Sequence, residues 1–226
     1  MVVCLDGVLD AAALQQVRAL LTQAPWAGGL SAGPQALLAK RNLQLPEEAP
    51  QLRELRGLVM RALNRSPLLL SAALPNKILP PNFNRYTPEA PAYGWHSDST
   101  LRYLPDGSCL RTDVSATLFL SAPEDYEGGE LCIEDTHGQQ QIKLAAGSLV
   151  LYPSGSVHEV RPVTRGERLA CYLFMQSVVK DSACRRHLYE MDLALMALRQ
   201  QLGEAHPELI RLTASYNNLL RRWAEC

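Results

Sequence analysis

The sequence predicts an α+β protein with an antiparallel β core, helices packed before it and a helical hairpin after it. Short apolar runs separated by Gly and Pro fill the middle of the chain, which is typical of an antiparallel sandwich or jelly roll. After residue 180 the apolar residues recur at helical spacing instead. We therefore expect residues 1–76 to form an N-terminal α/β support region, residues 77–180 the jelly-roll core, and residues 181–226 a C-terminal helical subdomain.

The N-terminal region alternates between strand and helix signals. Val2–Leu5 is short and partly β-branched, as in an edge strand, and Asp10 is the expected N-cap of a helix over Ala11–Gln23. Trp26–Pro34 is rich in Gly and Pro and indicates a loop with room for one strand. A second helix is predicted over Gln51–Asn64, where leucines and a valine share one face.

The predicted core consists of strands at short intervals. Lys77–Tyr86 contains two consecutive prolines, which an edge strand tolerates and a central strand does not. Leu131–Glu134 and Gln140–Leu144 predict a hairpin around a turn at residues 135–138. The remaining predicted strands are Arg111–Ser121, Ser148–Tyr152, Val157–Val160 and Arg168–Ser177.

Two apolar stripes follow in the last part of the chain. Gly203 is placed to end the first helix and Pro207 to begin the second. The apolar faces of such a hairpin need a partner, either the β core or another subunit, so a homodimer is one expectation. The stripe residues are Leu188, Met191, Leu195, Leu198 and Leu202 in the first helix, and Leu209, Leu212, Tyr216, Leu219 and Trp223 in the second.

Composition excludes several classes of protein. The net charge of −1 argues against a nucleic-acid partner bound through phosphate neutralisation, although it leaves room for a local basic patch. The six cysteines include no Cys-x-x-Cys pair, so neither a zinc site nor a dense disulfide framework is indicated. No stretch reaches the roughly 18 apolar residues of a membrane span, and no secretory signal is visible. We therefore expect a cytoplasmic protein without a membrane or nucleic-acid partner.

His96-Ser97-Asp98 is the first candidate for chemistry, because residues two apart on a strand point to the same face. Alone, such a triplet is usually a surface pair or a hydrogen-bonded turn. His158, at the start of a predicted strand, is the candidate for a third ligand. Two histidines and one carboxylate form the facial triad of non-haem iron(II) oxygenases, which leaves the opposite face of the metal open.

Arg168 follows His158 by ten residues, and Arg165-Gly166 supplies a turn that would put Arg168 on the neighbouring strand. Its neighbours along the predicted strand are apolar, so the guanidinium must pair with an anion or carry a large desolvation cost. One interpretation is an internal salt bridge with an acidic residue. The other is a bidentate clamp for the distal carboxylate of 2-oxoglutarate.

Agreement at many ordered sites along nearly the whole chain then indicates a known family. The sequence resembles the iron(II)/2-oxoglutarate dioxygenases, and most closely the bacterial PKHD-type hydroxylases, which are named for their similarity to prolyl and lysyl hydroxylases. One departure is the link before the His-x-Asp triplet, where two prolines stand in a segment that is often glycine-rich in the family. The matching segments are Asn84–Tyr86, His96–Asp98, Arg111–Leu120, Gly128–Leu131, Leu149–Ser154, His158, Pro162–Gly166, Arg168 and Tyr216–Trp223.

The resemblance implies a double-stranded β-helix core with Fe(II) held by His96, Asp98 and His158. It implies 2-oxoglutarate held by Arg168, and Tyr86 is the candidate for a second contact to the same carboxylate. The implied reaction couples O₂ and 2-oxoglutarate decarboxylation, which gives succinate and CO₂, to hydroxylation of a C–H bond. Family members are commonly associated with ascorbate as a reductant, and some with iron uptake.

The substrate is not specified by the sequence, and both peptidyl and small-molecule substrates are compatible with it. Tyr93, Trp95 and Arg102 flank the metal-binding segment and are the candidates for substrate contacts. Two other functions stay open at this point. A cupin-type dioxygenase would use O₂ without 2-oxoglutarate and would leave Arg168 without a role, and a non-catalytic iron-binding or sensor protein would need no open coordination face.

Overall fold

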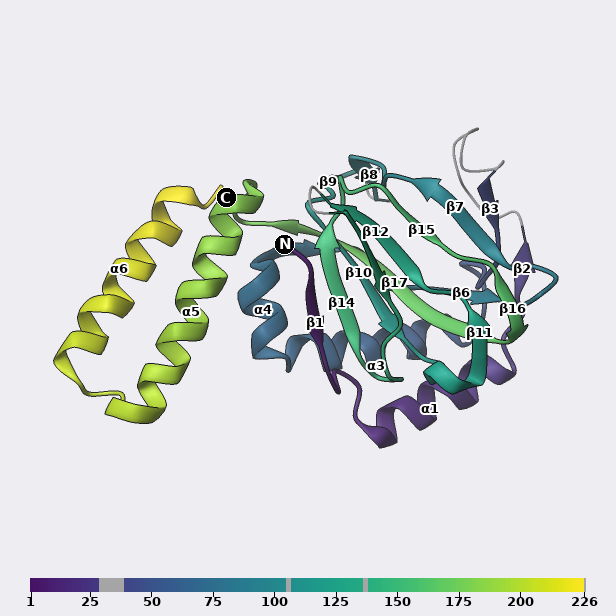
Figure 1. The fold of residues 1–226 in the computed structure, drawn as a ribbon, viewed down its shortest axis with the longest axis horizontal. Helices are drawn as coiled ribbons and strands as arrows, with labels where there is room; N and C mark the ends of the chain where they lie inside the picture. Colours follow the sequence, from purple (N-terminus) through teal and green to yellow (C-terminus); the bar gives the residue numbers. More distant parts are fainter. Residues whose placement is uncertain (29–38, 105–106, 136–137, 226) are drawn as a thin grey trace.

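The computed structural model describes residues 1–28, 39–104, 107–135 and 138–225, which form a β sandwich flanked by helices (Figure 1). Every strand pair in these ranges is antiparallel. Among the described residues the larger sheet has eight strands, with β5 (Pro75–Ile78) paired to β17 beside the main path. That path runs through β1 (Val3–Leu5), β14 (Leu149–Pro153), β10 (Val114–Phe119), β17 (Arg168–Ser177), β6 (Asn82–Tyr86), β4 (Leu43–Gln44) and β2 (Ala27–Gly28).

The smaller sheet faces the larger one and contains five strands within the described ranges. The described residues also form two separate two-stranded ribbons. This arrangement confirms the predicted antiparallel sandwich of the α+β class. The small sheet contains β13 (Gly138–Ile142), β12 (Leu131–Asp135), β15 (His158–Val160), β7 (Ala92–His96) and β3 (Lys40–Arg41), and the ribbons pair β11 (Tyr126–Gly128) with β16 (Val163–Gly166) and β8 (Leu101–Tyr103) with β9 (Cys109–Arg111).

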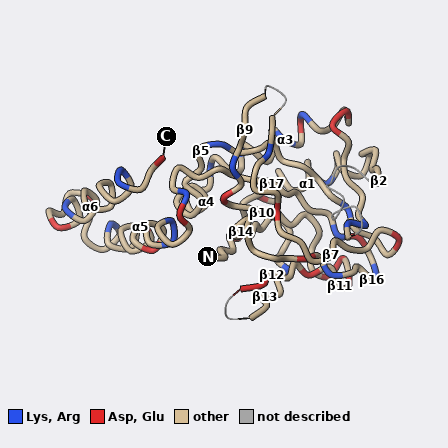
Figure 2. The backbone as a smooth tube through the Cα atoms, turned by 90° about the horizontal axis from the view of Figure 1, so that it is seen from above, with Lys and Arg blue, Asp and Glu red and all other residues tan. Residues whose placement is uncertain are grey.

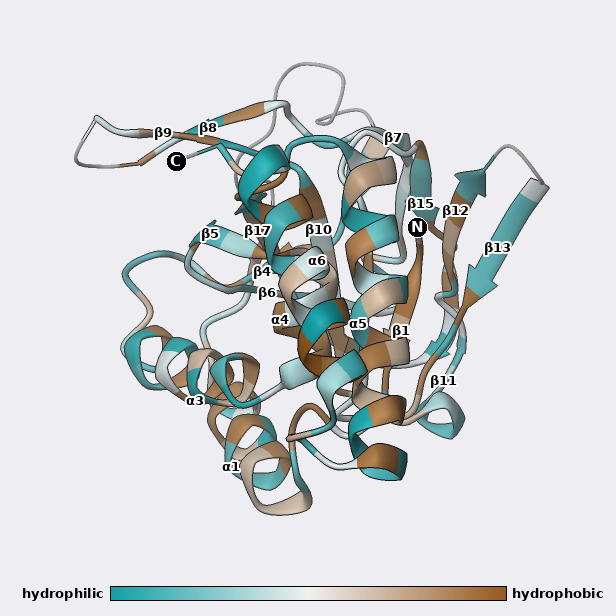
Figure 3. Cartoon of the chain, turned by 90° about the vertical axis from the view of Figure 1, so that its left-hand side faces the viewer, coloured by the Kyte–Doolittle hydropathy of each residue, from teal (hydrophilic) through white to brown (hydrophobic). Residues whose placement is uncertain are grey.

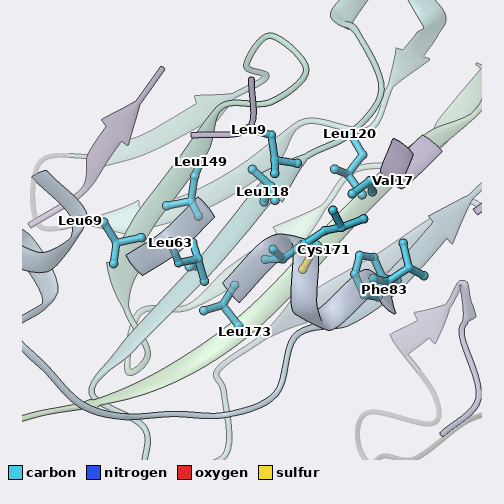
Figure 4. Packing of buried hydrophobic residues seen from close by; sticks show 14 of the residues in the cluster. Leu9, Val17, Leu63, Leu69, Phe83, Leu118, Leu120, Leu149, Cys171 and Leu173 are labelled. Atoms are coloured by element: carbon cyan, nitrogen blue, oxygen red, sulfur yellow. The ribbon is translucent and has the colours of Figure 1, made fainter. Parts of the chain in front are cut away.

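Among the described N-terminal residues, three helices pack on the outer face of the larger sheet: α1 (Ala11–Thr22), α3 (Leu52–Asn64) and α4 (Pro67–Ala73). The predicted N-cap of α1 is present, because the Asp10 side chain accepts a hydrogen bond from the Ala13 backbone N–H at 2.8 Å. Helix α4 was not predicted, although its start carries the signal of a Ser N-cap followed by Pro at the first helical position. Figure 4 shows Leu63 of α3 and Leu69 of α4 in one core with Leu118 of the larger sheet.

The side chains of strand β17 alternate between the core under the helices and the interior of the sandwich. Leu169, Cys171, Leu173 and Met175 belong to the core shared with the helices, whereas Arg168 and the aromatic residues between them face the interior of the sandwich. Successive side chains on a strand point to opposite faces, so one continuous strand serves both layers. The predicted alternation of Arg111–Ser121 holds in the same way, with Val114, Ala116, Leu118 and Leu120 in the helix-facing core.

The C-terminal hairpin consists of α5 (Ser182–Leu202) and α6 (Pro207–Trp223), which lie beside each other at one end of the sandwich (Figure 1). Gly203, with φ of +80°, ends α5, and Pro207 begins α6, as predicted. Helix α5 contacts α4, and the Glu225 backbone N–H returns to the Val178 carbonyl at 2.7 Å. Both helices carry residues of both charges (Figure 2) and hydrophobic turns beside hydrophilic ones (Figure 3).

The prediction of one edge strand over Lys77–Tyr86 was wrong. The segment forms two strands, β5 and β6, and the two prolines at positions 80 and 81 lie in the connection between them. Because the prolines are outside β6, they remove no hydrogen bond from the sheet, and β6 can lie in the interior between β17 and β4.

Some expectations fall outside the described residues. The predicted loop Trp26–Pro34 is described only up to Gly28, and the middle of the predicted turn at residues 135–138 is likewise outside the described ranges. Within those ranges, no helix has the length and apolar character needed to cross a bilayer.

Candidate active site

A cavity of about 710 Å³ lies between the two sheets. Its lining takes side chains from β6, β10, β14 and β17 of the larger sheet and from β3, β7, β12 and β15 of the smaller one. A concave site of this size with converging polar groups is the usual setting for a bound small molecule. All eight residues singled out by the sequence line it: Tyr86, Tyr93, Trp95, His96, Asp98, Arg102, His158 and Arg168.

Three potential metal ligands converge in this cavity. His96 is the last residue of β7 and His158 the first of β15, and the two are directly paired across the strands. One ligand atom each from His96, Asp98 and His158 lies within 4.8 Å of the others, and His158 Nε2 is 3.7 Å from Asp98 Oδ2. The expectation that His96 and Asp98 share one strand was wrong, because β7 ends at His96 and Asp98 lies in the following segment.

Backbone contacts orient both imidazoles. His96 Nδ1 lies 2.8 Å from the Gly94 carbonyl oxygen, and His158 Nδ1 lies 3.0 Å from the Ser156 carbonyl oxygen. A carbonyl oxygen can only accept a hydrogen bond, so in each ring Nδ1 is the donor and Nε2 of the neutral ring keeps its lone pair. This tautomer is the one that a metal on the cavity side requires.

Burial, followed by the positive charge that His158 could carry, lowers the pKa of His96 to about 4. His96 is therefore neutral near pH 7, as a metal-binding imidazole must be. The Tyr93 ring stacks on His96 with centroids 3.6 Å apart and contributes to this burial. The Ser115 hydroxyl donates to Asp98 Oδ2 at 2.6 Å and lies 2.8 Å from Ser154 Oγ, which fixes the carboxylate from the larger sheet.

Arg168 extends into the cavity from the larger sheet. The prediction that it would lie on the strand next to His158 was wrong: β17 belongs to the larger sheet and β15 to the smaller one, so Arg168 approaches from the opposite wall. The reason is that Arg165 and Gly166 belong to β16, which pairs with β11 in a separate ribbon, so the turn between them does not return the chain to the small sheet.

The guanidinium of Arg168 is a buried cation in a largely aromatic setting. Arg168 is 1% exposed, and its Cζ lies 5.2 Å from the ring centroids of both Tyr86 and Phe119. None of its three side-chain nitrogens has a hydrogen-bond partner among the described residues. An internal salt bridge, one of the two interpretations of this residue, is therefore absent from the described part of the chain. A buried guanidinium with all its donors unused is chemically matched to a carboxylate ligand.

Two glycines allow the chain to pass close to this guanidinium. Gly128 and Gly129 have φ of +72° and +68°, a region that other residues rarely adopt. A Cβ atom at position 129 would lie 2.9 Å from the Tyr126 ring and 3.0 Å from Arg168 Cδ. The Gly-Gly pair thus has a local steric role beside the candidate anion site.

The other predicted residues lie around these groups. Tyr86 is directly paired with Arg168 across β6 and β17, and burial raises the pKa of its hydroxyl, which stays protonated. Burial and the Asp98 carboxylate raise the pKa of Tyr93 to about 12. Trp95 is 42% exposed and Arg102 is half-buried, both at the cavity wall.

Several residues of the cavity were not predicted from the sequence. Ser115 and Thr117 are buried on β10, between apolar residues that were assigned to the opposite face. Polar side chains at alternate positions of a buried strand are a signal that could have found them, because buried hydroxyls need partners. Lys40 and Gln44 also line the cavity, from short strands in a segment without clear periodicity.

The donor set fits a particular metal and co-substrate. Two imidazole nitrogens and one carboxylate oxygen on one side of a cavity are typical of non-haem Fe(II), with the remaining coordination positions open. The unpartnered guanidinium on the facing wall suits the far carboxylate of a diacid bound to that metal.

Comparisons with known proteins agree with this geometry. Residues 81–176 match the 2OG-Fe(II) oxygenase superfamily, and residues 182–225 match the PKHD-type hydroxylase C-terminal domain. The PKHD-type hydroxylase of Nitrosomonas eutropha is 55% identical over 227 aligned residues, and that of Azoarcus sp. is 52% identical over 226, with all of both chains covered in each case.

Solved structures show the same fold at low sequence identity. A prolyl hydroxylase from Trichoplax adhaerens, in complex with a hypoxia-inducible-factor peptide fragment, has a TM-score of 0.55 at 19% identity and covers 83% of this chain and 86% of its own. A Pseudomonas putida prolyl-4-hydroxylase has a TM-score of 0.51 at 23% identity and covers 78% of this chain and 92% of its own. The predicted double-stranded β-helix is thereby confirmed.

The fold and the family matches define an enzyme class, the iron(II)- and 2-oxoglutarate-dependent dioxygenases. Within that class, the chain belongs to the PKHD-type hydroxylases. The predicted family and enzyme class are confirmed, and the family implies Fe(II) and 2-oxoglutarate as its metal and co-substrate.

Proposed function

We propose that His96, Asp98 and His158 hold the Fe(II) ion, and that Arg168 binds the distal carboxylate of 2-oxoglutarate. The observation that carries this assignment is the combination of three convergent ligand atoms with an unpartnered buried guanidinium in one cavity. Tyr86 is assigned the second contact to that carboxylate, because it is paired with Arg168 and lines the cavity beside it.

Each residue then has a defined task in the reaction. Iron with bound 2-oxoglutarate and O₂ supplies the oxidising chemistry, which couples decarboxylation to succinate and CO₂ with hydroxylation of a substrate C–H bond. His96, Asp98 and His158 would hold the ion through one imidazole or carboxylate atom each, which would leave further coordination positions for the co-substrate. Arg168 fixes the orientation of the co-substrate from the opposite wall, and the two sheets exclude water from the reacting atoms.

The hydroxylated substrate is proposed to be a peptidyl residue or a small molecule. Structural neighbours include the prolyl hydroxylase with a bound peptide fragment and HygX, whose structure contains nickel, 2-oxoglutarate and hygromycin B. Tyr93, Trp95 and Arg102 are assigned to the substrate side because they line the cavity near the proposed metal ligands.

The alternatives receive less support. A cupin-type dioxygenase without 2-oxoglutarate would leave the buried guanidinium of Arg168 without a partner. A non-catalytic iron sensor would not need a cavity of about 710 Å³ on the open side of the triad.

Several finer expectations stay predictions. These are O₂ as the oxidant, ascorbate as reductant, a link to iron uptake, a cytoplasmic location, and the division into regions 1–76, 77–180 and 181–226. A homodimer is a further prediction, supported by exposed apolar residues on the C-terminal hairpin. The exposed fractions of Leu202, Ile210 and Leu212 are 46%, 56% and 44%.

Anaerobic titration with Fe(II) and 2-oxoglutarate tests the assignment. We expect a visible metal-to-ligand charge-transfer band for the wild-type protein and its loss in His158→Ala. His187→Ala is the matched control, because His187 is exposed on α5 and should leave the band unchanged. A wild-type protein without the band, or a His158→Ala protein that keeps it, would contradict the proposal.

A further inference from the structure

Two buried asparagine side chains line the cavity and have no part in the assignments above. Asn42 is 5% exposed and Asn84 is 8% exposed. Neither amide atom of Asn42 has a hydrogen-bond partner among the described residues, and the same holds for Asn84 Oδ1. An amide buried without a partner costs free energy, and buried polar groups in proteins are nearly always paired. A ligand bound in the cavity beside these atoms would account for them.

The strand pairing brings both asparagines to the part of the larger sheet that carries Arg168. Asn84 and Tyr86 are two residues apart on β6, so their side chains share the face toward the cavity. Asn42 directly precedes β4, which pairs with β6 so that Gln44 lies opposite Asn84. Continuing this register by two residues places Asn42 beside Tyr86, which is itself paired with Arg168. Three neighbouring strands thus gather two amides, a phenol and a guanidinium.

The Tyr86 hydroxyl has a defined orientation within this group. Asn84 Nδ2 donates a hydrogen bond to Tyr86 Oη at 3.4 Å. A tyrosine hydroxyl has one proton of its own, and no described hydrogen bond uses it, so the proton is free for an acceptor in the cavity. Burial raises the pKa of Tyr86, and the Arg168 charge and then the Asn42 amide lower it in part. Both effects need the group to lie near the hydroxyl, in agreement with the register.

A carboxylate matches the unused groups at this point. The Arg168 nitrogens, Asn42 Nδ2 and the Tyr86 hydroxyl are donors without an acceptor among the described residues, and an ionised carboxylate only accepts. Asp98 is the sole carboxylate among the described residues that line the cavity, and its Oδ2 accepts from Ser115 instead. The three kinds of donor are thus left for a bound anion.

We propose that Asn42 and Asn84 complete the pocket for the distal carboxylate of 2-oxoglutarate. Asn42 contacts the carboxylate through Nδ2, and Asn84 is a positioning residue that directs the Tyr86 proton to the same group. The two Oδ1 atoms accept from water, because the carboxylate has no proton to donate. This inference rests on the proposed function, since it takes the Arg168 clamp as given. It adds neutral donors that select for a second carboxylate without another buried charge.

Calorimetry of the Mn(II)-loaded protein tests the contact by Asn42. Asn42→Leu and the smaller Asn42→Ala both remove the amide, so a packing defect in one of them does not decide the result. We expect 2-oxoglutarate to bind about 10–100-fold more weakly to each variant, which is the loss of one hydrogen bond to a charged group. Asn76→Leu is the matched control, because Asn76 is exposed on β5 and outside the cavity lining.

Oxalate separates the distal contact from the metal site. It chelates the metal through its two carboxylates and is too short to reach the distal position. Its affinity should therefore change by less than about twofold in the Asn42 variants. Unchanged 2-oxoglutarate affinity in both Asn42 variants would overturn the contact, and so would equal losses of affinity for oxalate and 2-oxoglutarate.

A double-mutant cycle tests the positioning role of Asn84. Tyr86→Phe removes the hydroxyl, and Asn84→Leu removes the amide that orients it. Each should weaken 2-oxoglutarate binding by about tenfold. Because Asn84 acts through the hydroxyl, Asn84→Leu should cause no further loss in the Tyr86→Phe background. Independent losses that multiply in the double variant would refute the positioning role, as would wild-type affinity in Asn84→Leu.

The ferrous charge-transfer band distinguishes a failure of this inference from a failure of the proposed function. The band is recorded on the same wild-type preparations as the calorimetry. If the band forms and the asparagine variants bind 2-oxoglutarate as the wild type does, the assignment of the amides alone is refuted. If the wild-type protein gives no band, the metal and 2-oxoglutarate site itself is refuted.

Discussion

Replacement of Arg168 by methionine should separate two effects of the buried guanidinium: its effect on the stability of the ligand-free protein and its effect on 2-oxoglutarate binding. Methionine has a similar length and is apolar, so Arg168→Met removes the charge and fills most of the volume. In the ligand-free protein the three unpartnered nitrogens are buried at 1% exposure, which disfavours the folded state. We expect Arg168→Met to raise the free energy of unfolding of the ligand-free protein by about 1 kcal/mol or more.

The same substitution should weaken 2-oxoglutarate binding strongly. A hydrogen bond to a charged group contributes about 1.5–3 kcal/mol, so loss of a bidentate pair corresponds to roughly 3–6 kcal/mol. That energy is a factor of about 10² to 10⁴ in the dissociation constant. The metal ligands lie on other elements, so metal binding should persist.

Two measurements test these effects together. Calorimetry of 2-oxoglutarate binding to the Mn(II)-loaded protein gives the affinity, and urea unfolding of the metal-free protein gives the stability. Arg85→Met is the matched control, because Arg85 lies on the neighbouring strand β6, outside the cavity lining, and pairs with Glu167. Wild-type affinity in Arg168→Met would refute the clamp, and a large loss of stability in the ligand-free protein would refute the view that its charge is uncompensated.

Three other predictions concern the support of the site. Ser115→Ala removes the 2.6 Å hydrogen bond to Asp98 and should lower Fe(II) affinity about 10–100-fold in competition with a chelator. Gly129→Ala should reduce the free energy of urea unfolding by roughly 1–3 kcal/mol more than Gly107→Ala, since both have positive φ but a Cβ added at position 107 would have no atom within 4 Å. The pKa of His96 is lowered to about 4, so the unfolded chain binds the extra proton first as pH falls. The metal-free protein should therefore lose stability between about pH 6.5 and 4 by denaturant titration, and His96→Gln should reduce this loss.

The elements predicted best from the sequence are those with strong local signals. Helix α1 begins at its Asp cap, the β12–β13 hairpin has the predicted pairing, and α5 ends at Gly203 because each feature depends on residues close in sequence. Helix α4, with seven residues, and the β8–β9 ribbon were missed because they are too short for periodicity to reveal.

The candidate site shows the same limit. The spacing of His96, Asp98 and His158 together with the family resemblance predicted which side chains gather around the cavity. It did not predict that Arg168 would approach from the opposite sheet, because strand adjacency is decided by pairing over long sequence distances. Ser115 was missed for a related reason: its relevance appears only when β10 is placed across the cavity from Asp98.

The hydrogen bonds that orient His96 and His158 are made to backbone carbonyl oxygens, which are present whatever side chain a residue carries. Each ring is held by a carbonyl two residues upstream, at Gly94 and at Ser156, and no side-chain replacement can delete a carbonyl oxygen. Substitutions of side chains in the cavity walls therefore leave the backbone acceptors that orient the His96 and His158 rings in place. Those walls are free to be reshaped for new reactants while the coordinating geometry stays inherited.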